Sequence, residues 1–269
     1  PLAAIGGTGL FTKEIQRALI VGQVDVAVHS LKDLPTLSRR ELTLGAIPPR
    51  EDVADALISP KYRTIEGLPQ GASVGTSSLR RRAQLLHRRP DLDVRTVRGN
   101  VETRLNLALD GQLDAVMLAW AGLHRLGLHG HVTERLEPPG SLPAVGQGAL
   151  GIECRRDDDE TLGLLAPLDD PATHRAVIAE RRTLAELEGG CMIPLAAWAR
   201  EFRVEEGSIL LALDAAVFEP DGKDRVLVSL DGPYDEPDEL GRRVADALRD
   251  QGALPLLERL REKEIETDL

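Results

Sequence analysis

A cysteine beside a pair of glycines is the first feature with a chemical meaning. Cys191 follows Gly189 and Gly190 and precedes an apolar segment, broken by Pro194, that is typical of a buried strand. Such a thiol can be a structural group, a nucleophile that turns over, or a fixed attachment point. A nucleophile needs a nearby base and a depressed pKa, and no histidine lies close in sequence. Attachment needs only access, which glycine supplies. The spacing alone leaves all three roles open.

Arginines are concentrated in one region of an acidic chain. The net charge of the 269 residues is −11, whereas residues 80–104 hold eight arginines against three acids, or 8 − 3 = +5. Residues 76–78, Thr-Ser-Ser, stand where a predicted strand meets a predicted helix, and the free N–H groups and hydroxyls there can bind an anion. The forked donors of Arg80 and Arg81 match carboxylates or phosphates. An ordinary helix cap with a solvated charged face explains this segment equally well.

Two further arginines favour the anion-binding interpretation. Arg98 stands at the end of the next predicted strand, and Arg104 lies in the first turn of the helix that follows. Ligands of doubly wound sheets collect at that edge. Nucleic-acid binders are more often basic over a whole domain and carry stacking aromatics. A small molecule with several anionic groups therefore fits better.

Polar side chains also follow a buried strand near the N-terminus. Ser30, Lys32 and Asp33 come directly after the β-branched run 24–29, a usual place for side chains that face a cleft. Asp33 precedes a Leu-Pro pair, so it is not part of a regular solvated helix face, although a turn-capping aspartate remains an alternative. We expect His29 to be a packed histidine rather than a base. No second His or Cys lies at metal spacing, so the sequence does not support a zinc site.

Helix and strand signals alternate through the first half of the chain, which predicts an α/β fold with a mainly parallel sheet. Two Pro/Gly-dense connections, 48–52 and 138–148, are predicted to form a hinge. The last third favours a separate α+β domain. The expected helices are 11–22, one ending at about 89, one from about 101, 175–188 and 237–252. The expected strands are 24–31, near 94, 114–120, 149–156, 207–218 and 224–230.

Composition narrows the class of protein. No apolar run approaches the roughly 18 residues that a membrane span needs. The chain begins without Met or a basic segment, so we expect it to be the interior of a longer sequence rather than to start with a signal peptide. Two cysteines, Cys154 and Cys191, then indicate reduced thiols in the cytosol. Cys154, in a short apolar strand, is expected to be a small buried hydrophobe.

Six segments together resemble the porphobilinogen deaminase family, also called hydroxymethylbilane synthases. The resemblance runs in order along the chain and is weakest after Ala199. The segments are VAVHSLKDLPT, VGTSSLRRRAQL, VRGNVETRL, LAWAGLHRLGL, LPAVGQGALGIECR and LEGGCMIPLAAWA.

The resemblance implies a cytoplasmic, monomeric enzyme of tetrapyrrole (heme) biosynthesis. It implies that Cys191 holds a dipyrromethane cofactor through a thioether and that four porphobilinogens are added to this primer, releasing ammonia and finally hydroxymethylbilane. Asp33 matches the catalytic aspartate, which would stabilise the charge that develops as ammonia leaves. The residues implied to bind the cofactor are Cys191, Lys32, Asp33, Thr76, Ser78, Arg80, Arg81, Arg104 and Arg125, and those implied to bind substrate are Ser30, Arg98, Arg104, Gln147 and Phe11.

The resemblance also implies three domains, the first two like the lobes of type II periplasmic binding proteins and the third a smaller α+β domain. Domain 1 would be residues 1–47 and 144–166, domain 2 residues 51–142, and domain 3 residues 170–269 with the cofactor cysteine. Ala4 and Thr8 stand where many family members carry lysines, so two cationic contacts are expected to be missing.

Two other functions remain compatible with the residues. A two-lobed receptor for a dicarboxylate would need the arginines but neither Asp33 nor Cys191. A thiol enzyme would use Cys191 as a nucleophile that is regenerated. No nucleic-acid or membrane partner is expected in any of these cases.

Overall fold

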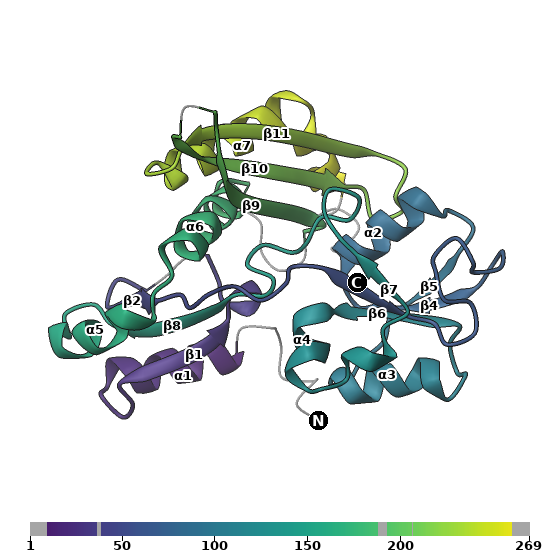
Figure 1. The fold of residues 1–269 in the computed structure, drawn as a ribbon, viewed down its shortest axis with the longest axis horizontal. Coiled ribbons are helices and arrows are strands. Elements are labelled where there is room, and N and C mark those ends of the chain that lie inside the picture. Colours follow the sequence, from purple (N-terminus) through teal and green to yellow (C-terminus); the bar gives the residue numbers. More distant parts are fainter. Residues whose placement is uncertain (1–9, 37–38, 188–192, 206, 260–269) are drawn as a thin grey trace.

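The computed structural model describes residues 10–36, 39–187, 193–205 and 207–259. In these ranges the strands form three sheets, each with its own helices, and Figure 1 shows them as three units around a common centre. No helix in the described ranges is long and apolar enough to cross a membrane.

The first sheet joins segments that are far apart in the sequence. Its central strand, β8, pairs antiparallel with β1 on one side and with β2 on the other. Cys154 on β8 is fully buried among Ala46, Ile152 and Leu165, which confirms the expected small buried hydrophobe. The elements are α1 (Leu10–Ile20), β1 (Val26–Ser30), the 3₁₀ turn Leu31–Asp33, β2 (Leu42–Ala46), β8 (Leu150–Arg155), α5 (Asp159–Leu165) and the 3₁₀ turn Ala166–Leu168.

The second sheet has five strands in the order β5-β4-β6-β3-β7. All four residues of β3 are buried, as expected for a strand covered on both faces. Ser78 and Asn100 begin the two adjoining helices by accepting hydrogen bonds from backbone N–H groups of the first turn. The elements are β3 (Asp55–Ile58), β4 (Ser73–Gly75), α2 (Leu79–Arg88), β5 (Asp93–Arg95), α3 (Val101–Leu109), β6 (Ala115–Ala119), α4 (Trp120–Arg125), the 3₁₀ turn His129–His131 and β7 (Glu134–Leu136).

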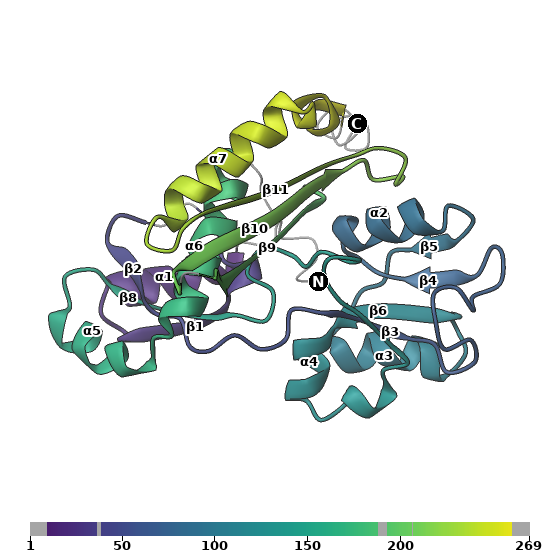
Figure 2. The same ribbon diagram turned by 45° about the horizontal axis from the view of Figure 1, so that its top comes forward.

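The third sheet is an antiparallel meander, β11-β10-β9, covered by two helices. Figure 2 shows α7 lying along this sheet with α6 beside it, and both helices contribute to the apolar core beneath. Asp170 caps α6, and Pro171 occupies its first position, where a missing N–H is harmless. The elements are α6 (Pro171–Glu186), β9 (Leu195–Arg203), β10 (Ile209–Phe218), β11 (Arg225–Pro233) and α7 (Pro237–Asp250).

The α/β class is as expected, but the strand directions are not mainly parallel. Parallel pairing occurs only where β4 lies between β5 and β6 in the described chain. The pairs β3–β6, β3–β7, β1–β8 and β2–β8 are antiparallel. The helix–strand alternation predicted the β4–α2–β5–α3–β6 block correctly. The antiparallel direction was missed because β3, β7 and β8 adjoin the Pro/Gly-dense connections, where no crossover helix sets the strand direction.

These two connections lie side by side between the first and second sheets. Glu51 N–H donates to the carbonyl of Gly148 at 2.9 Å, and Arg50 Nε donates to the carbonyl of Gln147 at 2.8 Å. Gly148 has φ +81°, and a Cβ there would lie 2.3 Å from the carbonyl oxygen of Glu51. A larger residue would therefore push the connections apart.

Candidate active site

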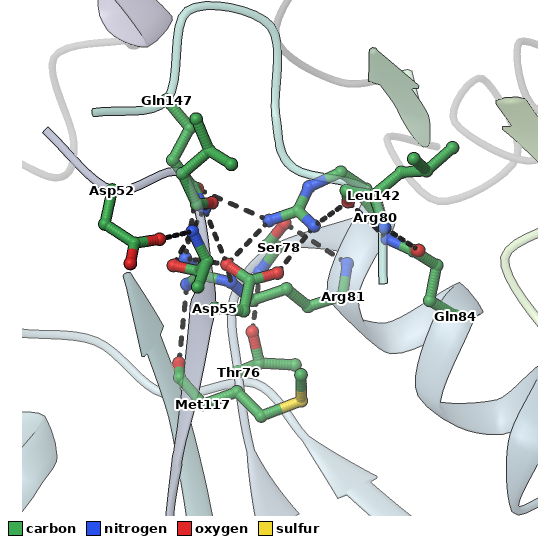
Figure 3. A network of polar contacts seen from close by, with 12 residues as sticks. Asp52, Asp55, Thr76, Ser78, Arg80, Arg81, Gln84, Met117, Leu142 and Gln147 are labelled. Carbon is green, nitrogen blue, oxygen red and sulfur yellow. Dashed lines mark hydrogen bonds and ion pairs between the residues drawn. The ribbon is translucent and has the colours of Figure 1, made fainter. Parts of the chain in front are cut away.

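A buried carboxylate and two guanidinium groups form a polar network at the start of β3 (Figure 3). Asp55 is 1 % exposed and accepts from Arg80 Nη1 at 2.6 Å and from Arg81 Nε at 2.9 Å. Both arginines lie in the first turn of α2, which Ser78 caps. Arg80 also donates to the carbonyl of Leu142 at 2.6 Å, which ties the second connection to this helix.

The charges of this cluster are strongly coupled. Burial alone would raise the pKa of the Asp55 carboxyl, but the charges and hydrogen bonds of Arg80 and Arg81 outweigh it and hold the pKa well below its usual range. Asp55 is therefore ionised at any physiological pH. Two guanidiniums against one carboxylate leave a net positive charge at the base of the site.

Gln147 joins this cluster to the second connection. It is 1 % exposed, and its amide Nε2 donates to the carbonyl of Val53 at 2.7 Å and to Asp55 Oδ1 at 2.9 Å. Its Oε1 accepts from Arg80 and Arg81 at 3.5 and 3.4 Å. In this arrangement Gln147 holds the arginines in place rather than facing solvent.

The turn Leu31–Asp33 faces this cluster from the first sheet. Leu31 is buried, whereas Lys32 and Asp33 are exposed at its surface. Lys32 reaches solvent, but the surrounding protein desolvates its ammonium group, and this together with the charge of Arg81 lowers its pKa. Asp33 and Asp55 oppose the shift. Residues from two different sheets thus form one electrostatic cluster.

A cleft of about 350 Å³ opens beside this turn. Its donors are Ser30 and Lys32 from the first sheet and Arg125 from α4. Glu51 is the acidic residue among those lining it, and His124 Nδ1 lies 2.9 Å from the Glu51 Oε2 atom. The remaining lining residues are Pro49, Ala119, Ala121, Gly122, Gly146, Gly148, Ala149 and Leu150.

Three arginines of the site lack a carboxylate partner among the described residues. Arg98 and Arg125 are exposed and form no ion pair there. Arg104, in α3, lies close enough to Arg81 to contribute to lowering the pKa of Arg81, although burial is the main cause. Its Nε atom is buried with no hydrogen-bond partner. Buried polar groups are normally paired, so this atom points to a missing acceptor.

This donor set fits a dipyrromethane, whose rings carry acetate and propionate groups. The orphaned Arg104 Nε and the unpaired guanidinium of Arg125 can each bind a carboxylate. Lys32 and Ser30 add donors on the opposite wall of the cleft. A polyacid would neutralise a site that is otherwise cationic.

The remaining expected site residues divide into two groups. Thr76 is 4 % exposed, with its hydroxyl accepting from Ser78 N–H at 3.2 Å, so both hydroxyls shape the start of α2. Phe11 lies in the first turn of α1, and its side chain is outside the described part of the structure. Cys191 also lies outside the described residues.

Sequence reasoning missed the partners of these groups. Asp55 binds Arg80 and Arg81, but the only sequence signal for this residue was its position beside a Pro-rich connection. Arg50 and Glu180, which form a buried pair with an Nη1–Oε1 distance of 2.6 Å, are 130 residues apart, so no local signal links them.

Relatives of high identity cover most of the chain. A porphobilinogen deaminase from Desulforudis audaxviator is 51 % identical over 260 residues, which cover 97 % of this chain and 82 % of that protein. One from Syntrophotalea carbinolica is 50 % identical over 253 residues, covering 94 % of this chain and 79 % of that protein. One from Halalkalibacterium halodurans is 48 % identical over 261 residues, covering 97 % and 82 %.

Solved structures of periplasmic binding proteins also match part of the chain. The aliphatic sulphonate binding protein of Escherichia coli is 17 % identical, with a TM-score of 0.39, and covers 65 % of this chain and 57 % of its own. A Salmonella typhimurium periplasmic binding protein with high arginine specificity is 18 % identical, with a TM-score of 0.35, covering 56 % and 67 %.

Two family models match successive parts of the sequence. Residues 1–163 match "Porphobilinogen deaminase, dipyromethane cofactor binding domain". Residues 174–250 match "Porphobilinogen deaminase, C-terminal domain". With these models and relatives at about half identity, the chain belongs to the porphobilinogen deaminase family.

Proposed function

We propose that the chain is a hydroxymethylbilane synthase. It joins four porphobilinogen molecules head to tail on a covalently bound primer, releases one ammonia per addition, and finally frees hydroxymethylbilane by hydrolysis. Family membership supports the activity. The observation that supports it in this chain is that Lys32, beside Asp33, interacts electrostatically with Arg81 and Arg80 and also lines a cleft with Ser30 and Arg125.

Asp33 is the catalytic residue of this proposal. Its carboxylate stabilises the positive charge that develops as ammonia leaves porphobilinogen, and it accepts and returns the proton that moves during coupling. Cys191 is the attachment point, and the dipyrromethane, when bound there, supplies the free pyrrole end to which substrate adds. The thiolate is needed once, for attachment, so no neighbouring base is required.

The cationic residues hold the carboxylates of substrate and cofactor. Lys32 and Arg125 line the cleft with Ser30 and are proposed as direct contacts. Arg104 is proposed as a further contact because its Nε atom has no partner. Arg98 binds substrate at the entrance to α3, and Phe11 in the first turn of α1 is proposed to bind substrate as well. Arg80 and Arg81 are proposed to bind cofactor carboxylates while they are bound to Asp55 and Gln147. Thr76 and Ser78, at the start of α2, are proposed to bind the cofactor beside them.

Intact mass spectrometry of the purified, folded protein tests this function. We expect a covalent dipyrrole on the wild-type chain, its loss in Cys191→Ser, and its retention in Cys154→Ser, because Cys154 is buried in the first sheet. A bare thiol in protein that still forms hydroxymethylbilane would refute the tether. A receptor for a dicarboxylate would carry no adduct, and a thiol enzyme would carry a transient one that exchanges with substrate.

The finer properties are proposals as well. We infer a monomer in the cytoplasm, with domains at residues 1–47 plus 144–166, 51–142 and 170–269. The three sheets support this division, since each lies within one of these ranges. Sedimentation velocity checks the monomer, and limited proteolysis near residues 48–52 and 138–148 checks the boundaries.

A further inference from the structure

One arginine of the third unit reaches the turn that carries Asp33. Arg181 lies on α6 and is 9 % exposed. Its Nη1 donates to the carbonyl of Leu34 at 2.9 Å and, more weakly, to that of Leu31 at 3.4 Å. Its Nη2 donates to the carbonyl of Pro35 at 2.7 Å. These acceptors bracket Lys32 and Asp33 on both sides, so one rigid guanidinium spans the whole turn.

The partners of this arginine are unusual for a buried cation. Among the described residues its hydrogen-bond acceptors are these three neutral carbonyls, whereas a buried arginine normally lies against a carboxylate. Burial lowers its pKa, and the charge of Glu153 in the first sheet opposes that shift. Burying a cation without a carboxylate lowers the stability of the fold, and proteins retain such local violations mainly at functional sites.

Glu180, the residue before Arg181, joins α6 to the two connections. Glu180 is fully buried and accepts from both Arg50 Nη atoms, at 2.6 and 3.0 Å. It also accepts from Gly146 N–H at 2.7 Å and from Ala199 N–H, on β9, at 2.9 Å. Glu180 and Arg181 thus bind α6 to the second connection and to the Asp33 turn within one helical turn.

The sequence places Cys191 between the two elements that this arrangement holds. Residues 188–192 connect the end of α6 to β9. Glu180 is part of α6, and it accepts a hydrogen bond from the backbone N–H of Ala199 on β9. A shift of α6 would therefore move the Asp33 turn and the attachment segment's flanks together.

Resting on the proposed function, we propose that Arg181 is a positioning residue for the deaminase reaction. It holds the backbone of residues 31–35 so that the Asp33 carboxylate stays aligned with the substrate ring while the chain grows. It contacts neither substrate nor cofactor in this role. Its removal should loosen the turn without removing the residues that bind carboxylates.

The test compares Arg181→Gln with Arg182→Gln. Arg182 is the adjacent residue, partly exposed and paired with Glu186 and Asp238 on the surface, so it controls for loss of an arginine from α6. In Arg181→Gln we expect kcat to fall about 10- to 100-fold, because a small misplacement of a catalytic group has that effect. KM should change much less than kcat, because Arg98, Arg104 and Arg125, which bind carboxylates in the proposed function, lie outside residues 31–35. Arg181→Lys, with a single ammonium nitrogen instead of a planar fork, should recover part of kcat.

A second measurement does not depend on activity. The amide of Leu34 is bonded to the carbonyl of Leu31 at 3.2 Å and closes the turn. Hydrogen exchange of the peptide covering residues 31–36 should become faster in Arg181→Gln and stay at the wild-type rate in Arg182→Gln. If Arg181→Gln does not fold, both measurements are made on Arg181→Lys.

The outcomes separate this proposal from the proposed function. Unchanged exchange of residues 31–36, or a wild-type kcat in a cofactor-loaded Arg181 variant, would overturn the positioning role. A rise in KM with unchanged kcat would also overturn it, because it would mean direct ligand binding. A wild-type protein without deaminase activity would refute the function, and the exchange experiment would then decide the positioning role alone.

Discussion

Arg50 and Glu180 form a buried bidentate ion pair that joins the first connection to the third unit, with N–O distances of 2.6 and 3.0 Å. Glu180 is fully buried and Arg50 is 10 % exposed at its side chain. The carboxylate also accepts two backbone N–H groups from elements on either side. One carboxylate therefore joins both connections to the third unit.

Replacing this carboxylate should destabilise the protein strongly. Glu180→Gln keeps the shape but leaves the Arg50 charge buried and unpaired, which typically costs about 3–5 kcal/mol. We expect a clear fall in the urea unfolding midpoint. Glu239→Gln is the matched control, because Glu239 pairs with Arg242 on the exposed face of α7, where an ion pair is worth about 0–1 kcal/mol. Equal midpoints for the two variants would contradict the structural role of the pair.

Asp33 should matter for turnover and little for folding. Its side chain is exposed on the turn, so Asp33→Asn removes charge without opening a cavity. We expect the melting temperature to stay near that of the wild type while kcat falls roughly 10²- to 10⁴-fold, the usual contribution of a general acid–base group. Intact mass confirms that the variant carries cofactor. Near-normal turnover would remove Asp33 from the chemistry.

Loss of Asp55 should change how stability depends on acid. The folded-state pKa of Asp55 lies well below the usual value of 3.8, so its contribution to stability is complete above pH 3.8 and is lost as pH falls from there through the lower folded-state pKa. Asp55→Asn should therefore lower the unfolding midpoint at neutral pH and make the acid dependence of stability shallower. Asp93→Asn is the control for loss of an aspartate charge, since Asp93 pairs with Arg95 at the solvent-exposed surface. A wild-type acid profile in Asp55→Asn would count against the buried cluster.

The sequence predicted the elements better than the partners within the site. Local signals are sufficient for α2, α3 and β6, because caps and apolar periodicity lie within each segment. Arg80 and Arg81 were expected to bind ligand carboxylates, and in the structure they bind Asp55, 25 and 26 residues away. Arginine chemistry is the same for either acceptor, so only the fold distinguishes them. β3 was missed because four buried residues beside a Pro-rich segment carry no periodicity.

Loss of the Lys32 charge should weaken substrate binding at alkaline pH, at a pH below the usual pKa range of lysine. Burial and the charge of Arg81 lower its pKa from 10.5, so the ammonium charge is present at low pH and is lost as pH rises through the lowered value. KM for porphobilinogen should therefore rise as pH increases through this pKa. Lys32→Arg, which stays charged, should move the rise to higher pH. Lys61→Arg is the control, because Lys61 is exposed with a raised pKa beside Tyr62. An identical alkaline limit in wild type and Lys32→Arg would exclude this assignment.

Gly148 should tolerate no side chain, because it combines a left-handed backbone with a close contact. In Gly148→Ala the new Cβ meets the carbonyl oxygen of Glu51 at 2.3 Å, so the connections must separate and the Glu51–Gly148 hydrogen bond must lengthen. Gly111→Ala isolates the backbone part of this effect, since Gly111 has φ +70° and nothing within 4 Å of the added Cβ. The left-handed conformation alone costs about 1–2 kcal/mol. We expect Gly148→Ala to lower the unfolding midpoint more than Gly111→Ala and, alone of the two, to lower kcat. If both variants lose the same stability and keep full activity, the contact between the two connections has no bearing on catalysis.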